Sequence, residues 1–275
     1  MAVRRAEIST ARAPGATISG NVLDGDIAVR TSAGMRGLFG EMRPGLVLDI
    51  PAGGGAQSAA LAKLGYRVLS ADLFASGRGT PSWSWVRADA NNAMPFAAAA
   101  FDYVLCREGI EHLEDQMGFV RECARVLKPG GKIVLTTPNV MHLAARASAF
   151  LTGQRNLRRG LVNEVQTLRA RNGSRLYHGH VFLLDYYRAR YILRVAGFDR
   201  LQVFTDKLSP TSIAMAPVVP ILWAAMKFAV AVSSRNVRHG GQRPPTPHVT
   251  RELISHVLSP SLLFGRRMIV VADRV

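Results

Sequence analysis

The chain has 275 residues, 48% of them hydrophobic, which is enough to bury one large core or one core with an appendage. Its two cysteines, Cys106 and Cys123, do not form a C-x-x-C pair, which excludes a metal site of that spacing and fits a reducing cytoplasm. The formal net charge of +16 predicts attraction to polyanions such as nucleic acid, anionic lipid or acidic substrates, although an Arg-rich composition alone would give the same value.

The first part of the chain, residues 1–43, is expected to be an N-terminal tail followed by a helix. Arg4 and Arg5 are not followed by an apolar run, so no secretory signal is expected. The start favours disorder or a loose lid, and residues 24–43 favour a helix packed over the edge of a sheet. Pro44 and Gly45 then mark the entry to the main domain, residues 44–275.

Residues 46–55, LVLDIPAGGG, predict a buried strand that runs into a glycine-rich turn. The apolar run is short and contains β-branched residues, and the glycines permit a sharp reversal of the backbone. A helix is expected from about Gln57, because residues 59–64 combine good helix formers with an apolar stripe. A strand, a glycine turn and a helix in this order are typical of the opening of a nucleotide-binding site.

Two aspartates lie at the ends of the predicted strands of this unit. Asp49 lies inside the apolar run, so its carboxylate is expected at the carboxyl end of the strand, where open α/β sheets bind ligands. Residues 67–71 predict the next strand, and Asp72 comes directly after it. One strand–helix–strand unit therefore brings two carboxylates to one edge of the sheet.

This arrangement resembles the first motif of the class I S-adenosylmethionine-dependent methyltransferases, in which an acid is followed by alternating glycines. The acid of the family falls on Asp49 and its later glycines on Gly53 and Gly55, whereas Pro51 replaces its first glycine. Pro51 fixes one backbone torsion and removes an N–H group, so a stiffer turn is expected. A dinucleotide-binding pattern is the alternative, but Ser58 stands where its third glycine is expected.

The resemblance implies which residues hold the cofactor, S-adenosyl-L-methionine. Asp49 and the turn would hold its methionine end, and Asp72 would accept the ribose hydroxyls. Residues 83–86 predict a third strand leading to Asp89, which with Ala90 would contact the adenine, unless Asp89 is only a solvated loop residue. The expected cofactor-binding residues are Asp49, Pro51, Gly53, Gly55, Asp72, Leu73, Asp89, Ala90 and Arg107.

A fourth strand is expected at residues 101–106, and the pattern E-x-x-E-H follows it with Glu108, Glu111 and His112. If a helix starts here, the three side chains share one face at the carboxyl edge of the sheet. The pattern resembles the one with which ubiquinone-type O-methyltransferases and small-RNA 2′-O-methyltransferases hold a divalent cation, for which Mg²⁺, Mn²⁺ and Zn²⁺ are the candidates. Many relatives keep the E-H pair without a metal, so His112 as a base or as a packing residue stays open.

An amphipathic helix at residues 119–127 and a fifth strand at 132–136 are expected around the string RVLKPGG. This string, with Thr137-Pro-Asn139 after the strand, is among the most specific signals of the family. An insertion at about 140–178 follows, and its residues 146–175 hold seven arginines against one acid, Glu164. These arginines form either a basic face over the methyl acceptor or a solvated helical face. They are Arg146, Arg155, Arg158, Arg159, Arg169, Arg171 and Arg175.

The sequence Tyr177-His-Gly-His180 supplies the last candidate ligands. In metal-using relatives a histidine in this place completes the site, which implies His180, with His178 as the second choice and a structural role as the alternative for both. The candidate catalytic residues are His112, His180 and Glu108. The candidate metal ligands are Glu108, Glu111, His112 and His180.

A helix at about 183–195 and a sixth strand at 201–205 precede a second insertion, residues 207–261, and a last strand at 267–272. If the sixth strand is parallel, both insertions leave from the ligand edge and roof one pocket. Residues 213–232 are apolar with a single charge, Lys227, which approaches a membrane-spanning length, although Pro217 and Pro220 argue against a clean span. Residues 221–232 therefore predict either a buried roof helix or a peripheral membrane contact, with Arg235, Arg238 and Arg243 available for anionic headgroups.

Together these features predict an α/β fold, a Rossmann-like doubly wound seven-stranded sheet with an antiparallel last strand and helical insertions after strands five and six. The resemblance implies a methyltransferase. The cysteines favour a cytoplasmic location, with a peripheral position at the inner membrane in one interpretation. Because basic and apolar insertions occur together, the favoured acceptor is a hydroxyl of a membrane-associated, glycan-type or other small bacterial metabolite. The expected partners are a small-molecule, glycan or lipid-linked substrate and an anionic membrane surface, with nucleic acid as a weaker choice. An RNA 2′-O-methyltransferase and a cofactor-binding protein without catalysis remain the alternatives.

Overall fold

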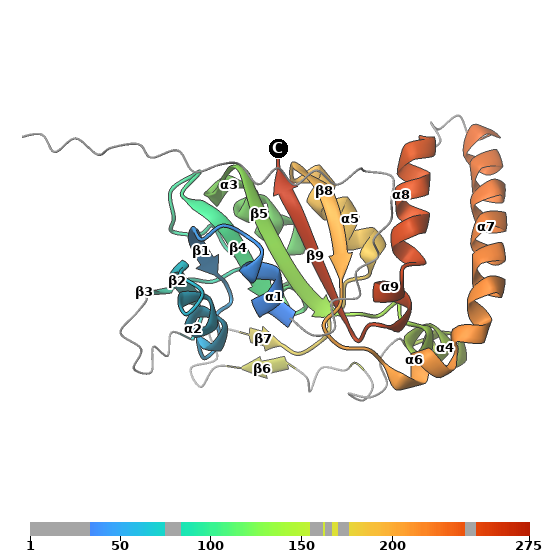
Figure 1. Ribbon diagram of the computed structural model, residues 1–275, viewed down its shortest axis with the longest axis horizontal. Coiled ribbons are helices and arrows are strands. Elements are labelled where there is room, and N and C mark those ends of the chain that lie inside the picture. Colours follow the sequence, from blue (N-terminus) through green and yellow to red (C-terminus); the bar gives the residue numbers. More distant parts are fainter. Residues whose placement is uncertain (1–33, 75–83, 155–161, 163–166, 170–175, 240–245) are drawn as a thin grey trace, which may run out of the picture.

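The computed structural model describes residues 34–74, 84–154, 162, 167–169, 176–239 and 246–275. A seven-stranded sheet with the order β3-β2-β1-β4-β5-β9-β8 forms its centre (Figure 1). The strands are β1 (Leu46–Asp49), β2 (Arg67–Asp72), β3 (Ser84–Arg87), β4 (Phe101–Arg107), β5 (Leu127–Pro138), β8 (Phe198–Phe204) and β9 (Arg267–Arg274). Strand β9 is antiparallel to both of its neighbours, and the remaining pairs are parallel. The predicted fold class is confirmed.

Helices cover both faces of the sheet. Phe39 of α1 and Leu61 of α2 lie in the apolar cluster on one face, and Phe119 of α3 and Tyr186 of α5 lie in the cluster on the other. The longer helices are α1 (Gly34–Gly40), α2 (Ala56–Ala62), α3 (Gln116–Val126), α4 (Leu143–Thr152), α5 (Tyr186–Val195), α7 (Val219–His239) and α8 (Pro247–Val257). The short elements are η1 (Ile110–His112), β6 (Thr167–Arg169), β7 (Leu176–His178), α6 (Pro210–Ala214), η4 (Ala216–Val218) and α9 (Pro260–Phe264). Since each face has its own helix layer and core, the sheet is doubly wound.

Strand β1 lies in the interior of the sheet because it is apolar on both faces. Val47 and Leu48 are fully buried on opposite sides, as is usual for a parallel strand covered by helices on both faces. The register pairs Asp49 with Ser70 of β2 and with Leu105 of β4. The carboxyl ends of three neighbouring strands therefore surround the start of the glycine-rich turn.

Strands β5 and β8 are both antiparallel to β9 and are therefore parallel to each other. The sixth strand of the sequence analysis, β8, is therefore parallel to β5. Both insertions leave from the carboxyl edge of the sheet. The helix expected at 119–127 begins earlier, since α3 starts at Gln116 and the Asp115 carboxylate caps it by accepting the backbone N–H of Gly118. The strand expected at 132–136 also begins earlier, because β5 already pairs with β4 at Leu127.

The second insertion does not roof the cofactor cavity as a buried helix. Its helix α7 stands at the outer side of the molecule next to α8, away from β1 and α2 (Figure 1). The segment Ala216–Ser233 has a mean hydropathy of 1.7 and is long and apolar enough to cross a membrane. None of this segment is buried. The roof-helix prediction is wrong, because an apolar sequence does not itself show whether a neighbour covers it.

Only a small part of the arginine-rich stretch lies within the described residues. Arg155, Arg158, Arg159, Arg171 and Arg175 lie outside them, as do Glu164, Arg243 and residues 1–33. Arg146 is half-buried in α4 and donates to the backbone carbonyls of Met141 and Val257. Its guanidinium therefore ties α4 to α8 and is not part of a solvated basic face.

Candidate active site

The turn between β1 and α2 is shaped by two glycines in the left-handed region. Gly53 has a φ of 55° and Gly55 a φ of 76°, conformations that glycine adopts without a steric cost. Gly55 is also the N-cap of α2 and does not line the cavity described below, so it shapes the turn. A Cβ atom at Gly53 or Gly54 would meet nothing within 4 Å, so this backbone borders open space.

Asp72 at the end of β2 holds the turn in place. One carboxylate oxygen accepts the backbone N–H of Gly53 at 2.8 Å, and the other accepts that of Phe74 at 2.8 Å. A carboxylate oxygen has two lone pairs, so each can accept a further hydrogen bond from a ligand. The carboxylate is thus oriented by the backbone and still able to bind hydroxyl groups.

Asp49 is held from the opposite side, by side chains. The Ser58 hydroxyl donates to Asp49 Oδ2 at 2.6 Å and lies 2.6 Å from the hydroxyl of Ser70. Burial raises the pKa of Asp49 to about 6, against the lowering effects of Ser58 and of the Arg107 charge. Sequence reasoning took Ser58 only as a missing glycine, whereas the structure shows that it is the hydrogen-bond partner of the acid.

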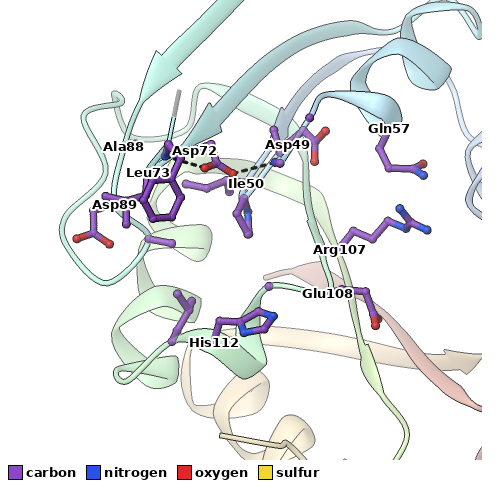
Figure 2. A pocket seen from close by; sticks show the side chains of 18 of the residues that line it. Asp49, Ile50, Gln57, Asp72, Leu73, Ala88, Asp89, Arg107, Glu108 and His112 are labelled. Atoms are coloured by element: carbon purple, nitrogen blue, oxygen red, sulfur yellow. Dashed lines mark hydrogen bonds between the residues drawn. The ribbon is translucent and has the colours of Figure 1, made fainter. Parts of the chain in front are cut away.

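A cavity of about 720 Å³ opens at this edge of the sheet (Figure 2). The predicted cofactor-binding residues that line it are Asp49, Pro51, Gly53, Asp72, Leu73, Asp89, Ala90 and Arg107. The cavity is also lined by residues that the sequence analysis does not assign to the site: Ile50, Ala52, Gly54, Ala56, Gln57, Phe74, Ala88, Asn91, Gly109 and Leu113. Most of them are direct neighbours in sequence of a predicted residue, so they could have been inferred from the predicted ends of the strands.

Asp89 is at the edge of this cavity, and local contacts shape its loop. Its carboxylate accepts the backbone N–H of Asn91 at 3.0 Å and the side-chain amide of Asn92 at 2.8 Å. Together with Ala88 it lies at the same end of the cavity as Asp72 (Figure 2), and Ala90 also lines the cavity. Asp89 is thus a loop residue that faces the cavity, so the two interpretations made from the sequence do not exclude each other.

His112 lies across the cavity from Asp72 (Figure 2). Its Nδ1 atom is 2.6 Å from the backbone carbonyl of His178 and 3.1 Å from that of Gly179. Two carbonyl acceptors require a proton on Nδ1, so in the neutral ring the lone pair is on Nε2. This side chain therefore has a fixed tautomer, with a basic nitrogen at the other ring position.

Glu111, His112 and His180 form a cluster in which the nearest ligand atoms lie within 4.8 Å of one another. The rings of His112 and His180 meet edge to face with centroids 4.8 Å apart, and His180 Nδ1 is 3.9 Å from Glu111 Oε1. Glu111 is fully buried and accepts a hydrogen bond from Thr137. Of the two histidines weighed from the sequence, His180 joins the cluster, whereas His178 pairs with Glu114 through its Nε2 atom at 2.6 Å.

Glu108 is the exception among the predicted ligands, because no helix starts at this residue. It has a φ of 49°, and its N–H bonds to Thr136 of β5, so the chain is still part of the sheet edge. The helical turn begins only at Ile110, and the Glu108 carboxylate pairs with Arg267 at 3.1 Å. The predicted common face therefore contains Glu111 and His112 without Glu108.

Comparison with known proteins identifies the domain. A family model described as "Methyltransferase domain" matches residues 48–135. The ubiquinone biosynthesis O-methyltransferase of Xanthomonas oryzae pv. oryzae is 39% identical over 102 residues, which are 34% of this chain and 43% of that protein. The protein of the same name from Idiomarina loihiensis is 36% identical over 115 residues, 38% of this chain and 44% of that protein. The matches thus span less than half the length of these curated relatives.

A solved structure described as a SAM-dependent methyltransferase from Archaeoglobus fulgidus aligns with a TM-score of 0.49 and 15% identity, over 87% of this chain and 90% of that chain. The matched residues 48–135 contain the glycine-rich turn, Asp49, Asp72, Asp89 and the E-x-x-E-H pattern. With these residues on a sheet of the order described above, residues 48–135 match a methyltransferase domain, and the findings support a class I S-adenosylmethionine-dependent methyltransferase.

Proposed function

We propose that the protein transfers a methyl group from S-adenosylmethionine to a hydroxyl group of a small molecule. The observation that carries this proposal is the position of His112, a histidine of fixed tautomer across one cavity from the carboxylate of Asp72. The curated relatives support it, because their name describes an O-methyltransferase. A hydroxyl group is a poor nucleophile while it is protonated, so a nearby proton acceptor is the feature that this reaction needs.

The residues that line the cavity support binding of the cofactor. The Asp72 carboxylate is available for the two ribose hydroxyls, and Asp49 places a negative charge near the turn. The bare backbone at Gly53 and Gly54 allows close approach of a ligand. When bound, S-adenosylmethionine supplies a methyl group on a positively charged sulfur. The chain then contributes mainly by holding donor and acceptor in line and by excluding water.

His112 is the residue that we assign to proton removal. Because its Nδ1–H is donated to the carbonyls of His178 and Gly179, its Nε2 atom can take the proton of the acceptor hydroxyl. These carbonyls also stabilise the imidazolium that forms. His180 packs edge to face on the ring and holds its orientation.

A divalent cation is the alternative way to activate the hydroxyl. A histidine that ligates a metal usually donates its other N–H to a carbonyl or carboxylate, which is the arrangement of His112. Glu111, His112 and His180 would then hold Mg²⁺, Mn²⁺ or Zn²⁺, which lowers the pKa of a bound hydroxyl. The two roles exclude each other, since Nε2 cannot be both ligand and base.

The acceptor class that we favour is a membrane-associated or glycan-type metabolite, because a strongly basic chain and an exposed apolar helix occur together. A cytoplasmic location remains a prediction, consistent with the buried free thiols of Cys106 and Cys123. The RNA 2′-O-methyltransferase alternative is supported by the net charge of +16 and by the resemblance of the E-x-x-E-H pattern to that of small-RNA 2′-O-methyltransferases. Incubating purified protein and labelled cofactor with the small-molecule and RNA fractions of cell extract, followed by mass spectrometry, separates the two acceptor classes.

The variants His112→Ala and His180→Ala test the mechanism, with His248→Ala as the matched control because His248 is exposed on α8. We expect His112→Ala to keep cofactor binding and to lose turnover by roughly a hundredfold or more, and His248→Ala to keep both. Unchanged turnover in both site variants would remove the base and the metal assignments. Cofactor binding without methylation of any fraction by the intact protein would favour the non-catalytic alternative.

A further inference from the structure

Helix α7 has two apolar faces, and among the described residues only one of these faces contacts the rest of the protein. Val219, Leu222, Met226 and Val230 are half-buried and follow a helical spacing, which makes them the inner stripe. Met226 packs against the main core cluster. A surface helix of a globular protein normally has a polar outer face, so the composition of the opposite face is unusual.

The outer stripe consists of Ile221, Ala225, Phe228 and Val232, all of them exposed, and we call it the α7 surface. Ile221 is 71% exposed and Phe228 is 73% exposed. Their spacing of four, three and four residues places them on one side of the helix. Large apolar side chains in such a row mark a contact site rather than scattered surface residues.

Helices α4 and α6 lie at the lower end of α7 in Figure 1 and also expose apolar side chains. Ile213 of α6 and Val218 of η4 are exposed, and so are Phe150 and Leu151 at the end of α4. Phe150 is 89% exposed, which is the largest exposure among the aromatic residues that the structure describes. These residues come from both insertions, and both insertions leave from the carboxyl edge of the sheet.

Basic residues border this surface. Lys227 lies between the two stripes with its ammonium group 3.9 Å from the ring centre of Trp223, an arrangement that suits an interface between apolar and aqueous phases. In the sequence, Arg235 and Arg238 follow the apolar part of the same helix. Residues 216–233 contain no acid.

We propose that the α7 surface lies on an anionic lipid bilayer, with the helix parallel to the membrane plane and its apolar row among the acyl chains. The charge of the chain decides between lipid and a second copy, because two chains of net charge +16 repel each other, whereas anionic headgroups attract them. We place the helix on the membrane and not across it, since Met226 of its half-buried inner stripe packs against the core cluster. This inference is independent of the proposed reaction.

Flotation with vesicles tests the proposal on the intact chain. Vesicles of phosphatidylcholine mixed with phosphatidylglycerol are compared with vesicles of phosphatidylcholine alone, for the intact protein and for the double variant Ile221→Ser/Phe228→Ser. The matched control is Tyr191→Ser, which removes an exposed aromatic side chain from α5. We expect binding to the anionic vesicles only, a loss on the order of tenfold or more in the double variant, and no change in the control.

A second readout uses the Trp223 indole. Lipids with brominated acyl chains should quench the fluorescence of the intact protein, and Trp223→Phe should remove most of that quenching. Cofactor binding measured by calorimetry shows that each variant is folded, because the α7 surface does not line the cavity. The proposal is overturned if the intact protein does not float, or if the double variant floats equally well. It is also overturned if the double variant loses only a dimer seen by light scattering.

Discussion

The ring of Pro51 occupies the space that a side chain on Gly109 would need. A Cβ atom at residue 109 would lie 2.3 Å from Cδ and 2.5 Å from Cγ of Pro51, closer than any real contact of this kind. Pro51 belongs to the glycine-rich turn and Gly109 to the segment between β4 and His112, and both line the cavity. The two halves of the site are therefore packed directly against each other at a proline that replaces the usual glycine.

This contact predicts that Gly109→Ala damages both stability and cofactor binding. The added methyl group forces the turn and the segment before His112 apart, which should lower the free energy of unfolding by about 1–3 kcal/mol. Urea denaturation and calorimetry with the cofactor measure the two effects. Gly40→Ala is the control, because a Cβ atom there would meet nothing within 4 Å. Equal behaviour of the two variants would contradict the close packing.

The raised pKa of Asp49 means that its ionised carboxylate lowers the free energy of unfolding of the protein. Because the carboxyl has a pKa of about 6 when folded against the ordinary 3.8, the folded state binds the proton more tightly than the unfolded state. Its contribution to stability is therefore present below the ordinary pKa and is lost as the pH rises through about 6. Asp49→Asn should stabilise the cofactor-free protein by about 2–3 kcal/mol at pH 8 and by little near pH 4.

Denaturant titrations of both proteins across this pH range measure the difference. An Asp49→Asn variant that is less stable than the intact protein at pH 8 would show that the burial cost is balanced by interactions of the charged form. The same variant should bind the cofactor more weakly, since it has lost the negative charge beside the turn.

The hydrogen bond from Ser58 to Asp49 should affect the pH dependence of cofactor binding. Its hydroxyl donates to Asp49 and lowers the pKa of that carboxyl, so Ser58→Ala should raise the pKa further. We expect the pH at which cofactor affinity falls to half to move upward in this variant, because the carboxylate is lost earlier as the solution is acidified. Binding curves over a pH series measure it, with Ser255→Ala on the exposed side of α8 as the control. A shift to lower pH, or none, would count against this role.

The two possible roles of the cluster at His112 differ in their response to metal. If Glu111, His112 and His180 hold a cation, Glu111→Gln should weaken Mn²⁺ binding about tenfold or more, and a chelator should stop turnover. Glu114→Gln is the control, because Glu114 is exposed and pairs with His178 outside the cluster. Full turnover of the intact protein in the presence of a chelator would leave His112 as the base.

The sheet and most of the cavity could be predicted because both follow from short apolar runs. Such a run predicts a strand buried on two faces, and the residues after it must lie at the carboxyl edge, which is how Asp49 and Asp72 were found. Ser58 was missed because a motif is defined by the residues it expects, and a hydrogen bond between a serine and an acid nine positions earlier has no local pattern.

Two other errors have different causes. Glu108 was placed on a helical face because its spacing to His112 fits a helix, but its φ of 49° is rare for a non-glycine residue and depends on the neighbouring strand. For helix α7 the sequence left a buried roof and a peripheral membrane contact open, since an apolar sequence is equally compatible with a protein interior and with an exposed surface, and only the buried roof is wrong. In both cases tertiary contacts decide, and they are not encoded in the local sequence.

The central claim is that Asp49 and Asp72 bind one S-adenosylmethionine molecule across the glycine-rich turn. Calorimetric titration of the intact chain with this cofactor measures it most directly, alongside Asp49→Asn/Asp72→Asn and the control Asp199→Asn, a half-buried aspartate outside the cavity. The account predicts saturable binding by the intact chain and by the control, and a loss on the order of a hundredfold in the double variant. Binding of equal strength in the double variant, or no binding by the intact chain, would contradict it.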